Sequence, residues 1–206
     1  TSGFLARWAC AGVRVSFDKR DAELFFDVRL PQEEKAHRAD EAMKVARWLG
    51  ADGSDTAYRV FPGPDDDDEA ERVLRGLGWP NGRKWVAVHP GNIKKFETRW
   101  PEGNFAALCD RLERRGGVCV LLIKGPGEDP LIASILERME ARPPVAPALP
   151  LLPTAALLRR MDLVVCNSTS TLHLAAAMDV PTLSFLSGYN EACWKPRGPK
   201  HRCVVS

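Results

Sequence analysis

The sequence predicts an α/β fold in which helices cover both faces of a parallel sheet. Short apolar segments alternate with amphipathic segments from residue 85 to the end of the chain. The apolar segments are continuous rather than alternating, which is typical of parallel strands buried on both faces. Polar or glycine-containing loops follow these segments, as in nucleotide-binding sheets. We therefore expect a Rossmann-like, doubly wound domain over residues 81–206, preceded by a different region over residues 1–80.

The composition is compatible with a packed globular chain. Of the 206 residues, 45% are apolar and 27% are charged, which argues against disorder. The formal net charge of +2 is too small to indicate a nucleic-acid partner. No apolar stretch reaches the ~18 residues that a membrane span needs, and no secretory signal pattern occurs, so we expect a cytoplasmic location. Because the first residue is Thr1, we also expect a fragment or a processed chain.

Six cysteines are present, and none is part of a CxxC pair. Three of them lie in or beside apolar segments, so we expect buried free thiols rather than disulfides or zinc ligands. They are Cys10, Cys109, Cys119, Cys166, Cys193 and Cys203.

Apolar runs and helical periodicity locate the elements of the second region. The helices show an apolar position every three or four residues, and glycines follow the first of them. The expected strands are residues 85–89, 118–123, 162–166 and 181–186, with short ones near 145–149 and 203–206. The expected helices are residues 101–117, 128–141, 154–161 and a segment that starts near Ser170.

The first 84 residues show fewer clear elements. We expect a strand at residues 13–17 and an amphipathic helix over residues 33–51, with apolar positions in phase at Ala39, Met43, Ala46 and Leu49. A second helix is expected to follow the "FPGP" turn and to start with the four acids at residues 65–68. An acidic metal site is an alternative for these acids. A solvated helix start is favoured, because consecutive carboxylates point in different directions and the helix dipole attracts them.

The loops at the carboxyl ends of the strands are the expected ligand site, since open parallel sheets bind ligands there. These loops are polar, and several carry cations or glycines. Together they indicate a site for an anionic ligand. They comprise residues 89–101, 124–129, 167–171 and 187–202.

The loop "NSTST" leads into a helix, and two interpretations of it remain open. Thr169, Ser170 and Thr171 lie where backbone N–H groups at a helix start are available to a phosphate, and His173 follows within the first turn. Alternatively, the hydroxyls cap the helix and His173 packs in a partial core. A cap needs one hydroxyl, whereas this segment offers several.

Glu128 also has two interpretations. It follows two glycines at a strand end, where a carboxylate can accept both hydroxyls of a ribose. It could instead cap the next helix, a role that Asp129 before Pro130 could already fill.

The loop after the first strand carries backbone donors and cations. Gly91 and Asn92 offer backbone amides, and Lys94, Lys95 and Arg99 add positive charge suited to a diphosphate. For any single one of these cations, a solvated loop residue is the favoured interpretation. The chain contains no P-loop and no GxGxxG motif, which argues against those two nucleotide-binding classes.

Three segments in this order resemble glycosyltransferase family 9, the ADP-heptose:lipopolysaccharide heptosyltransferases. They are "HPGN…RWPEGNFAALCDRLERRG", "VLLIKGPGE" and "LVVCNSTSTLHLAAAMDVPTLSFLSG…CWKPRGP", which span residues 86–199. The passage over residues 3–51 resembles the end of that family's first domain and its linker.

The resemblance implies a GT-B architecture, in which two Rossmann-like domains face each other across a cleft. Residues 1–80 would then be the end of the acceptor domain with the linker, and residues 81–206 the donor-binding domain. No metal and no cofactor are implied, since cationic side chains and helix N-termini would offset the leaving diphosphate. Lys95 and Arg99 are the expected catalytic cations. The implied donor-binding residues are Gly91, Asn92, Glu128, Ser168, Thr169, Ser170 and His173.

The chain departs from the family pattern at two motifs. Ser168, Thr169 and Ser170 stand where the family usually has Asp-Thr-Gly, so an acid that touches the donor is missing. Thr98 stands where a lysine usually precedes the WP tryptophan, and Lys94, Lys95 or Arg99 would have to substitute. The acceptor-activating aspartate is expected outside this chain.

The resemblance implies an inverting transferase that moves a heptose-like sugar from an ADP-sugar to a lipopolysaccharide core acceptor. The implied partners are a nucleotide-sugar, with ADP-heptose favoured, and a lipid-linked saccharide. A peripheral contact with the inner membrane through the basic residues 194–202 is a further expectation, although an exposed basic loop is the simpler interpretation. The alternatives are a degenerate nucleotide-binding module without transfer activity and a GT-B enzyme with another donor, such as a UDP-sugar. This piece alone is expected to be inactive.

Overall fold

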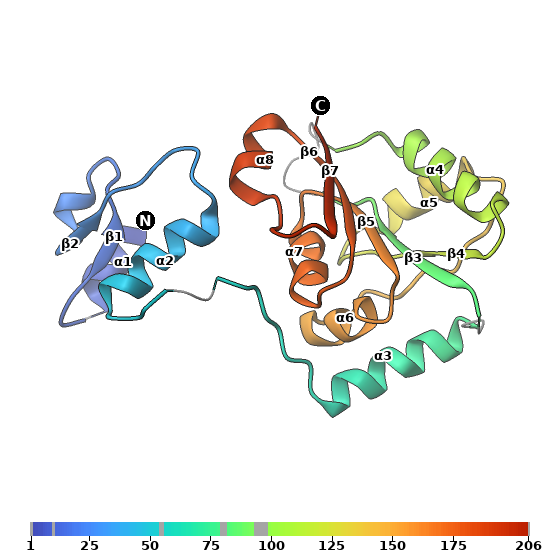
Figure 1. Cartoon of the computed structure of the whole chain (residues 1–206), viewed down its shortest axis with the longest axis horizontal. Helices are drawn as coiled ribbons and strands as arrows, with labels where there is room; N and C mark the ends of the chain where they lie inside the picture. The colour runs from blue at the N-terminus through green and yellow to red at the C-terminus, as the bar shows by residue number, and fades with distance from the viewer. Residues whose placement is uncertain (1, 10, 54–55, 79–81, 93–98, 206) are drawn as a thin grey trace. The chain divides into compact units, whose positions relative to one another are not determined.

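The chain folds into two compact units (Figure 1). The computed structural model describes residues 2–9, 11–53, 56–78, 82–92 and 99–205. The first unit is Thr1–Thr56 with Ala192–Trp194, and the second is Ala57–Glu191 with Lys195–Ser206. The division therefore falls at residues 56/57, whereas the predicted boundary is at 80/81.

The second unit is built on a five-stranded sheet. The strands are β3 (Lys84–His89), β4 (Val118–Leu122), β5 (Leu163–Asn167), β6 (Thr182–Leu186) and β7 (His201–Val205). They lie in the order β4-β3-β5-β6-β7, and every neighbouring pair is parallel. The predicted parallel sheet is confirmed. The short strand expected near residues 145–149 is a single bridge between Val145 and Leu122.

Helices cover both faces of this sheet, as predicted. Successive residues of one strand point to opposite faces, so Ala87 belongs to one apolar core and Val88 to the other. The helices α4 (Glu102–Arg114) and α5 (Asp129–Glu137) close one core. The helices α6 (Leu151–Leu158) and α7 (Ser170–Ala177) close the other.

Helix α3 (Pro64–Gly76) belongs to the second unit because it packs on α6. Its buried residues Ala70 and Leu74 lie in the same core as α6 and α7. The interpretation of residues 65–68 as a helix start is confirmed, because the Gly63 N–H donates to Asp66 Oδ2 at 2.8 Å. Asp67 pairs with arginines after α6, and the described residues contain no cluster of three metal-ligating side chains.

The first unit contains a two-stranded parallel sheet of β1 (Val15–Phe17) and β2 (Val28–Leu30). It also contains α1 (Ser2–Trp8), a 3-10 turn η1 (Ala22–Leu24) and α2 (Arg38–Trp48). The sequence patterns did not indicate α1, η1 or β2, which are too short to show a clear period. Helix α8 (Gly188–Trp194), also not predicted, ends with three residues that are assigned to this unit.

One predicted apolar position of α2 is wrong. Leu49 is 72% exposed, because it is the C-cap residue and lies just beyond the helix. The buried residue of this helix is Glu41, whose carboxylate pairs with Lys44 at 2.7 Å.

The cysteines described by the structure are free thiols, as expected. Cys109, Cys119, Cys166 and Cys193 are buried, and Cys203 is partly exposed. Burial raises the pKa of Cys109 and of Cys166 to about 12, which keeps both thiols protonated and unreactive. Cys10 lies outside the described residues.

Candidate functional site

The strand order creates a switch point between β3 and β5. After β3 the chain moves to the edge strand β4 and then returns to β5 on the other side of β3. The connections that leave β3 and β5 therefore diverge, although His89 is directly opposite Cys166 in the register. Ligands of open parallel sheets bind at such a point, outside the carboxyl ends of the strands.

A buried histidine links the loops at this switch point. His89 Nε2 lies 3.1 Å from Glu128 Oε2, and its Nδ1 lies 3.4 Å from Thr169 Oγ1. His89 is 6% exposed and Glu128 is 5% exposed. Glu128 comes from the loop after β4 and Thr169 from the loop after β5. The structure thus joins the end of β3 and the loops after β4 and β5 in one chain of polar contacts.

Glu128 does not use its carboxylate to cap the helix that it precedes. It occupies the N-cap position of α5 without a side-chain cap hydrogen bond. Its Oε2 instead accepts a hydrogen bond from the backbone N–H of Gly125 at 2.6 Å, in addition to the contact with His89. The capping interpretation is therefore wrong, and the carboxylate is aimed at the switch point.

Glu128 stays ionised in this environment. Burial alone raises its pKa, but the hydrogen bonds from His89 and Gly125, together with electrostatic attraction to nearby groups that include Arg99, outweigh burial. The pKa of Glu128 consequently lies below its ordinary value. A carboxylate that is ionised at neutral pH is a strong acceptor for hydroxyl groups.

Gly91 is required by the close approach of Glu128. A Cβ atom at residue 91 would lie 1.8 Å from Glu128 Oε1 and 2.4 Å from its carboxyl carbon. No side chain fits in that space without movement of the carboxylate. The glycine thus permits the loop after β3 to lie directly against Glu128.

We expect Gly91→Ala to displace the Glu128 carboxylate and to destabilise the protein by about 1–3 kcal/mol, the usual effect of overpacking. Denaturant unfolding followed by circular dichroism measures this change. Gly103→Ala is the matched control, because a Cβ there meets nothing within 4 Å. Gly103 lies in α4, where alanine is favoured over glycine, so the control should be neutral or slightly stabilising. Equal stability of Gly91→Ala and the wild type would contradict the prediction.

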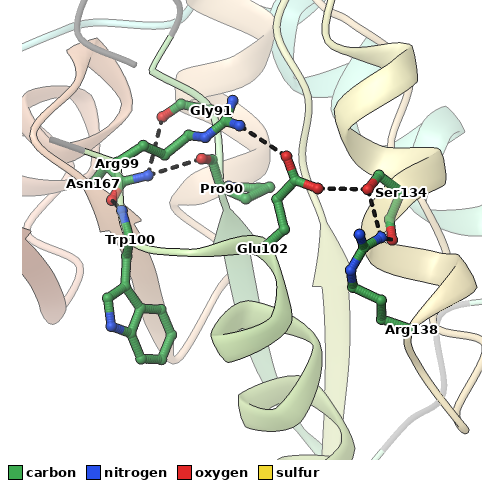
Figure 2. Close-up of polar contacts among 8 residues, drawn as sticks. All are labelled: Pro90, Gly91, Arg99, Trp100, Glu102, Ser134, Arg138 and Asn167. Atoms are coloured by element: carbon green, nitrogen blue, oxygen red, sulfur yellow. Dashed lines mark hydrogen bonds and ion pairs between the residues drawn. The ribbon is translucent and has the colours of Figure 1, made fainter. Parts of the chain in front are cut away.

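Asn167 anchors both ends of the loop between β3 and α4 (Figure 2). Its Nδ2 donates to the carbonyl oxygens of Pro90 at 2.8 Å and Gly91 at 3.4 Å. Its Oδ1 accepts a hydrogen bond from the backbone N–H of Trp100 at 3.0 Å. The fully buried side chain therefore fixes Pro90, Gly91 and Trp100 relative to the end of β5.

Arg99 is held beside the site by an acid (Figure 2). Its Nη2 donates to Glu102 Oε1 at 2.8 Å, and the other oxygen of Glu102 accepts from Ser134. Arg138 in turn donates to the Ser134 hydroxyl at 2.6 Å. Arg99 thus contributes positive charge near Glu128 from a fixed position. Lys94, Lys95 and Thr98 lie outside the described residues.

The loop after β5 presents hydroxyls at the start of α7. Thr169 is the N-cap residue, but its side chain makes no cap hydrogen bond and contacts His89 instead. Ser168 is half-buried and Ser170 is exposed. The expectation that these hydroxyls only cap the helix therefore fails for Thr169.

His173 and Asn92 lie at the same edge of the sheet. Asn92 is a buried residue of the loop after β3. His173 is half-buried, and its ring lies edge-on to Tyr58, with ring centroids 6.2 Å apart. Tyr58 precedes α3, so the segment before α3 contacts the start of α7.

Sequence patterns did not identify His89 or Asn167 as site residues. His89 was counted as the end of a buried strand, and Asn167 as one polar residue of a loop. A signal existed for both, since each is a polar residue that directly follows an apolar run and ends its strand. Such a position points to the carboxyl edge, where the ligand site of a parallel sheet lies.

A known family model matches the whole chain. The family model described as "Glycosyltransferase family 9 (heptosyltransferase)" matches residues 1–206. No curated protein matches the sequence. No helix among the described residues has the length and apolar character needed to cross a membrane.

Solved structures establish the similarity of the fold. A family 9 glycosyltransferase from Veillonella parvula has a TM-score of 0.83 at 22% identity, over 99% of this chain and 58% of its own. E. coli ADP-heptose lps heptosyltransferase II has a TM-score of 0.77 at 17% identity, over 100% and 64%. The E. coli heptosyltransferase WaaC with ADP has a TM-score of 0.71 at 22% identity, over 100% and 63%.

The present chain thus spans about three fifths of the length of these structures. Its five-stranded parallel sheet corresponds to part of the GT-B heptosyltransferase fold. The match of the family model over the whole length decides the assignment: the chain belongs to glycosyltransferase family 9, the heptosyltransferase family.

Proposed function

We propose that this chain is the donor-binding part of an inverting glycosyltransferase that transfers a heptose-like sugar from an ADP-sugar to a lipopolysaccharide core acceptor. The observation that carries the proposal is the ionised, buried Glu128 held by His89 against Gly91 at the switch point of the sheet. One structure of the E. coli heptosyltransferase WaaC contains ADP and another contains ADP-2-deoxy-2-fluoro heptose, which supports an ADP-sugar as the donor.

Glu128 is the proposed ribose ligand. Both of its hydrogen bonds among the described residues end on Oε2, so Oε1 can accept a ribose hydroxyl. The neighbouring backbone of Gly91 and Asn92 would lie beside the phosphates. The proposed donor domain comprises residues 81–206, and helix α3 from the preceding region packs into the same core. The rest of residues 1–80 is the proposed end of the acceptor domain with the linker.

The start of α7 is the proposed seat of the diphosphate. Backbone N–H groups at a helix start and the hydroxyls of Ser168, Thr169 and Ser170 favour negative charge. His173, in the first turn of α7, would face the diphosphate and the sugar.

Electrostatic stabilisation of the leaving group is the main catalytic contribution proposed for this chain. In a single displacement the acceptor oxygen bonds to the anomeric carbon as the bond from that carbon to the diphosphate breaks, which inverts the configuration. The acceptor proton passes to a base outside this chain, and ADP leaves with the bonding electron pair. Lys95 and Arg99 are the proposed cations that offset the charge on ADP, without a metal ion.

The basic segment at residues 194–202 contributes less to a membrane contact than its composition suggests. Lys195 pairs with Glu191 at 3.5 Å, and Lys200 pairs with Asp179 at 2.5 Å. These acids reduce the local positive charge. A lipid-linked saccharide remains the proposed acceptor, with peripheral membrane contact through that lipid.

Calorimetric titration with ADP tests the proposal. We expect the wild type to bind ADP and Glu128→Gln to bind it about 10- to 100-fold more weakly, since a hydrogen bond to a charged group contributes ~1.5–3 kcal/mol. Glu137→Gln is the matched control, because Glu137 is an exposed acid on α5. No binding of ADP by the wild type, or tighter binding of UDP, would overturn the proposed donor.

A nucleotide-binding module without transfer activity is the second candidate. It is favoured by Ser168, Thr169 and Ser170, which supply no carboxylate where the family pattern has one. ADP binding combined with no sugar transfer by the full-length protein, in an assay with ADP-heptose and lipopolysaccharide core acceptor, would establish it.

A further inference from the structure

His89 stands out among the site residues because two of its contacts are made by different ring nitrogens. Nε2 faces Glu128 and Nδ1 faces Thr169, so the ring bridges the loop after β4 and the loop after β5. These partners are 39 and 80 residues away in the sequence. The ring itself is fixed by its position at the end of β3 and by burial.

The directions of the hydrogen bonds follow from the chemistry of the partners. Glu128 is ionised and offers only acceptors, so Nε2 must carry a proton and donate to Oε2. In the neutral ring Nδ1 then accepts, and the Thr169 hydroxyl donates to it. This arrangement directs the lone pairs of Thr169 Oγ1 away from the ring.

The position of the Glu128 carboxylate depends on three neighbours. The Gly125 N–H and His89 Nε2 hold Oε2, and the Gly91 backbone lies against Oε1. Gly125 and Gly91 act through the backbone, so His89 is the only one of these three that uses a side chain. Removal of the Nε2–H would leave the Gly125 N–H as the remaining donor to Oε2. The Glu128 carboxylate could then rotate into the space left by the ring.

We propose that His89 is a positioning residue that acts through Glu128, and that it gives the site its selectivity for a ribonucleoside diphosphate over the dideoxy analogue. This inference rests on the proposed function, in which Glu128 binds the ribose hydroxyls. His89 holds Oε2 so that Oε1 meets those hydroxyls, and it does not touch the donor itself.

Two conservative variants separate the two contacts of the ring. The amide nitrogen of glutamine in His89→Gln can reach the position of Nε2 and still donate to Glu128. Asparagine in His89→Asn is shorter, so it reaches only the position of Nδ1 and loses Glu128. His37→Asn is the matched control, because His37 caps α2 in the first unit and asparagine is a good N-cap residue.

Calorimetric titration of each variant with ADP and with 2′,3′-dideoxy-ADP measures the selectivity. We expect the wild type, His37→Asn and His89→Gln to prefer ADP by about 10-fold or more, which is about 1.4 kcal/mol. His89→Asn and Glu128→Gln should lose this preference and bind both nucleotides with similar, weaker affinity. If the role of His89 were purely structural, its substitution would instead weaken the binding of both nucleotides equally, and the ratio of the two affinities would stay unchanged.

The outcomes distinguish this inference from the proposed function. If the wild type and His89→Asn both prefer ADP while Glu128→Gln does not, the positioning role is overturned and the proposed function stands. If the wild type binds no ADP, the proposed function is overturned. The inferred selectivity for ADP is then overturned as well. Circular dichroism spectra of all variants verify that they are folded.

A measurement without nucleotide tests the contact itself. Nitrogen-15 NMR of the wild-type histidine rings should show Nε2 of His89 protonated, and Glu128→Gln should shift that signal. A His89 ring that carries its only proton on Nδ1 would overturn the inference, even if a substitution at residue 89 prevented folding.

Discussion

Asn167→Asp is expected to destabilise the second unit by about 3–5 kcal/mol, the range for an uncompensated charge in a protein interior. Aspartate has nearly the same shape, so the packing is unchanged. One carboxylate oxygen can still accept from Trp100 N–H, but the other faces the carbonyl oxygens of Pro90 and Gly91, where Asn167 donates. The variant therefore replaces two hydrogen bonds with repulsion between a carboxylate oxygen and two carbonyl oxygens, at a fully buried position.

The predicted effect depends on pH. Burial and the two carbonyls raise the pKa of the new carboxyl group in the folded state above its value in the unfolded chain. The folded state then binds the proton more tightly, so the destabilisation relative to the wild type should shrink as the pH falls. Guanidinium unfolding at several pH values measures it.

Asn104→Asp is the matched control for this variant. Asn104 is exposed in the first turn of α4, where a negative charge is favoured by the helix dipole. We expect no loss of stability there. A change of less than 1 kcal/mol in Asn167→Asp at neutral pH would show that Asn167 does not hold the loop as described.

Phe105→Ala is expected to destabilise the second unit by about 3–5 kcal/mol, because it leaves a cavity in a closely packed core. The Phe105 ring is fully buried on α4. It lies edge-on to Trp100 and to Phe185, at centroid distances of 4.9 Å and 5.7 Å, and those two rings stack at 4.0 Å. Loss of Phe105 removes two aromatic contacts as well as buried area.

Phe61→Ala provides the comparison for the aromatic variant. Phe61 also belongs to the second unit but is 78% exposed, so its loss should change the free energy of unfolding by less than about 0.5 kcal/mol. Denaturant unfolding followed by circular dichroism compares the variants. Similar losses in both would contradict the packing argument.

Trp100 connects this aromatic cluster to the site. Its ring packs between α4 and β6, while its backbone N–H donates to Asn167. Phe105→Ala should therefore also loosen the end of the loop between β3 and α4. Weaker ADP binding by the folded variant would reveal that coupling.

Several elements could be predicted from local patterns in the sequence. The strands β3, β4 and β5 each contain a continuous apolar run that is buried in the structure. Strand β6 alternates polar and apolar residues and was located by the apolar residues that follow Pro181. The start of α3 follows from its acids, which favour a helix N-terminus. Helix α1 and strand β2 were missed because three to seven residues are too few to show a period.

The site was predicted at the correct edge of the sheet, but not all of its residues were predicted. Glu128 and Thr169 could be identified, since each follows an apolar run. Their connection through His89 could not, because it joins residues that are distant in the sequence. The need for glycine at residue 91 was likewise hidden, because it arises from a carboxylate of another loop.

The sequence by itself determined the α/β class, the positions of the main strands, the edge that carries the polar loops and the resemblance to family 9. These depend on residue patterns that act over a few positions of the chain. Only the tertiary structure decided the strand order β4-β3-β5-β6-β7, the placement of α3 in the second unit and the partners of Glu128. Each of these depends on contacts between distant segments, because packing in three dimensions selects which loops meet at the switch point.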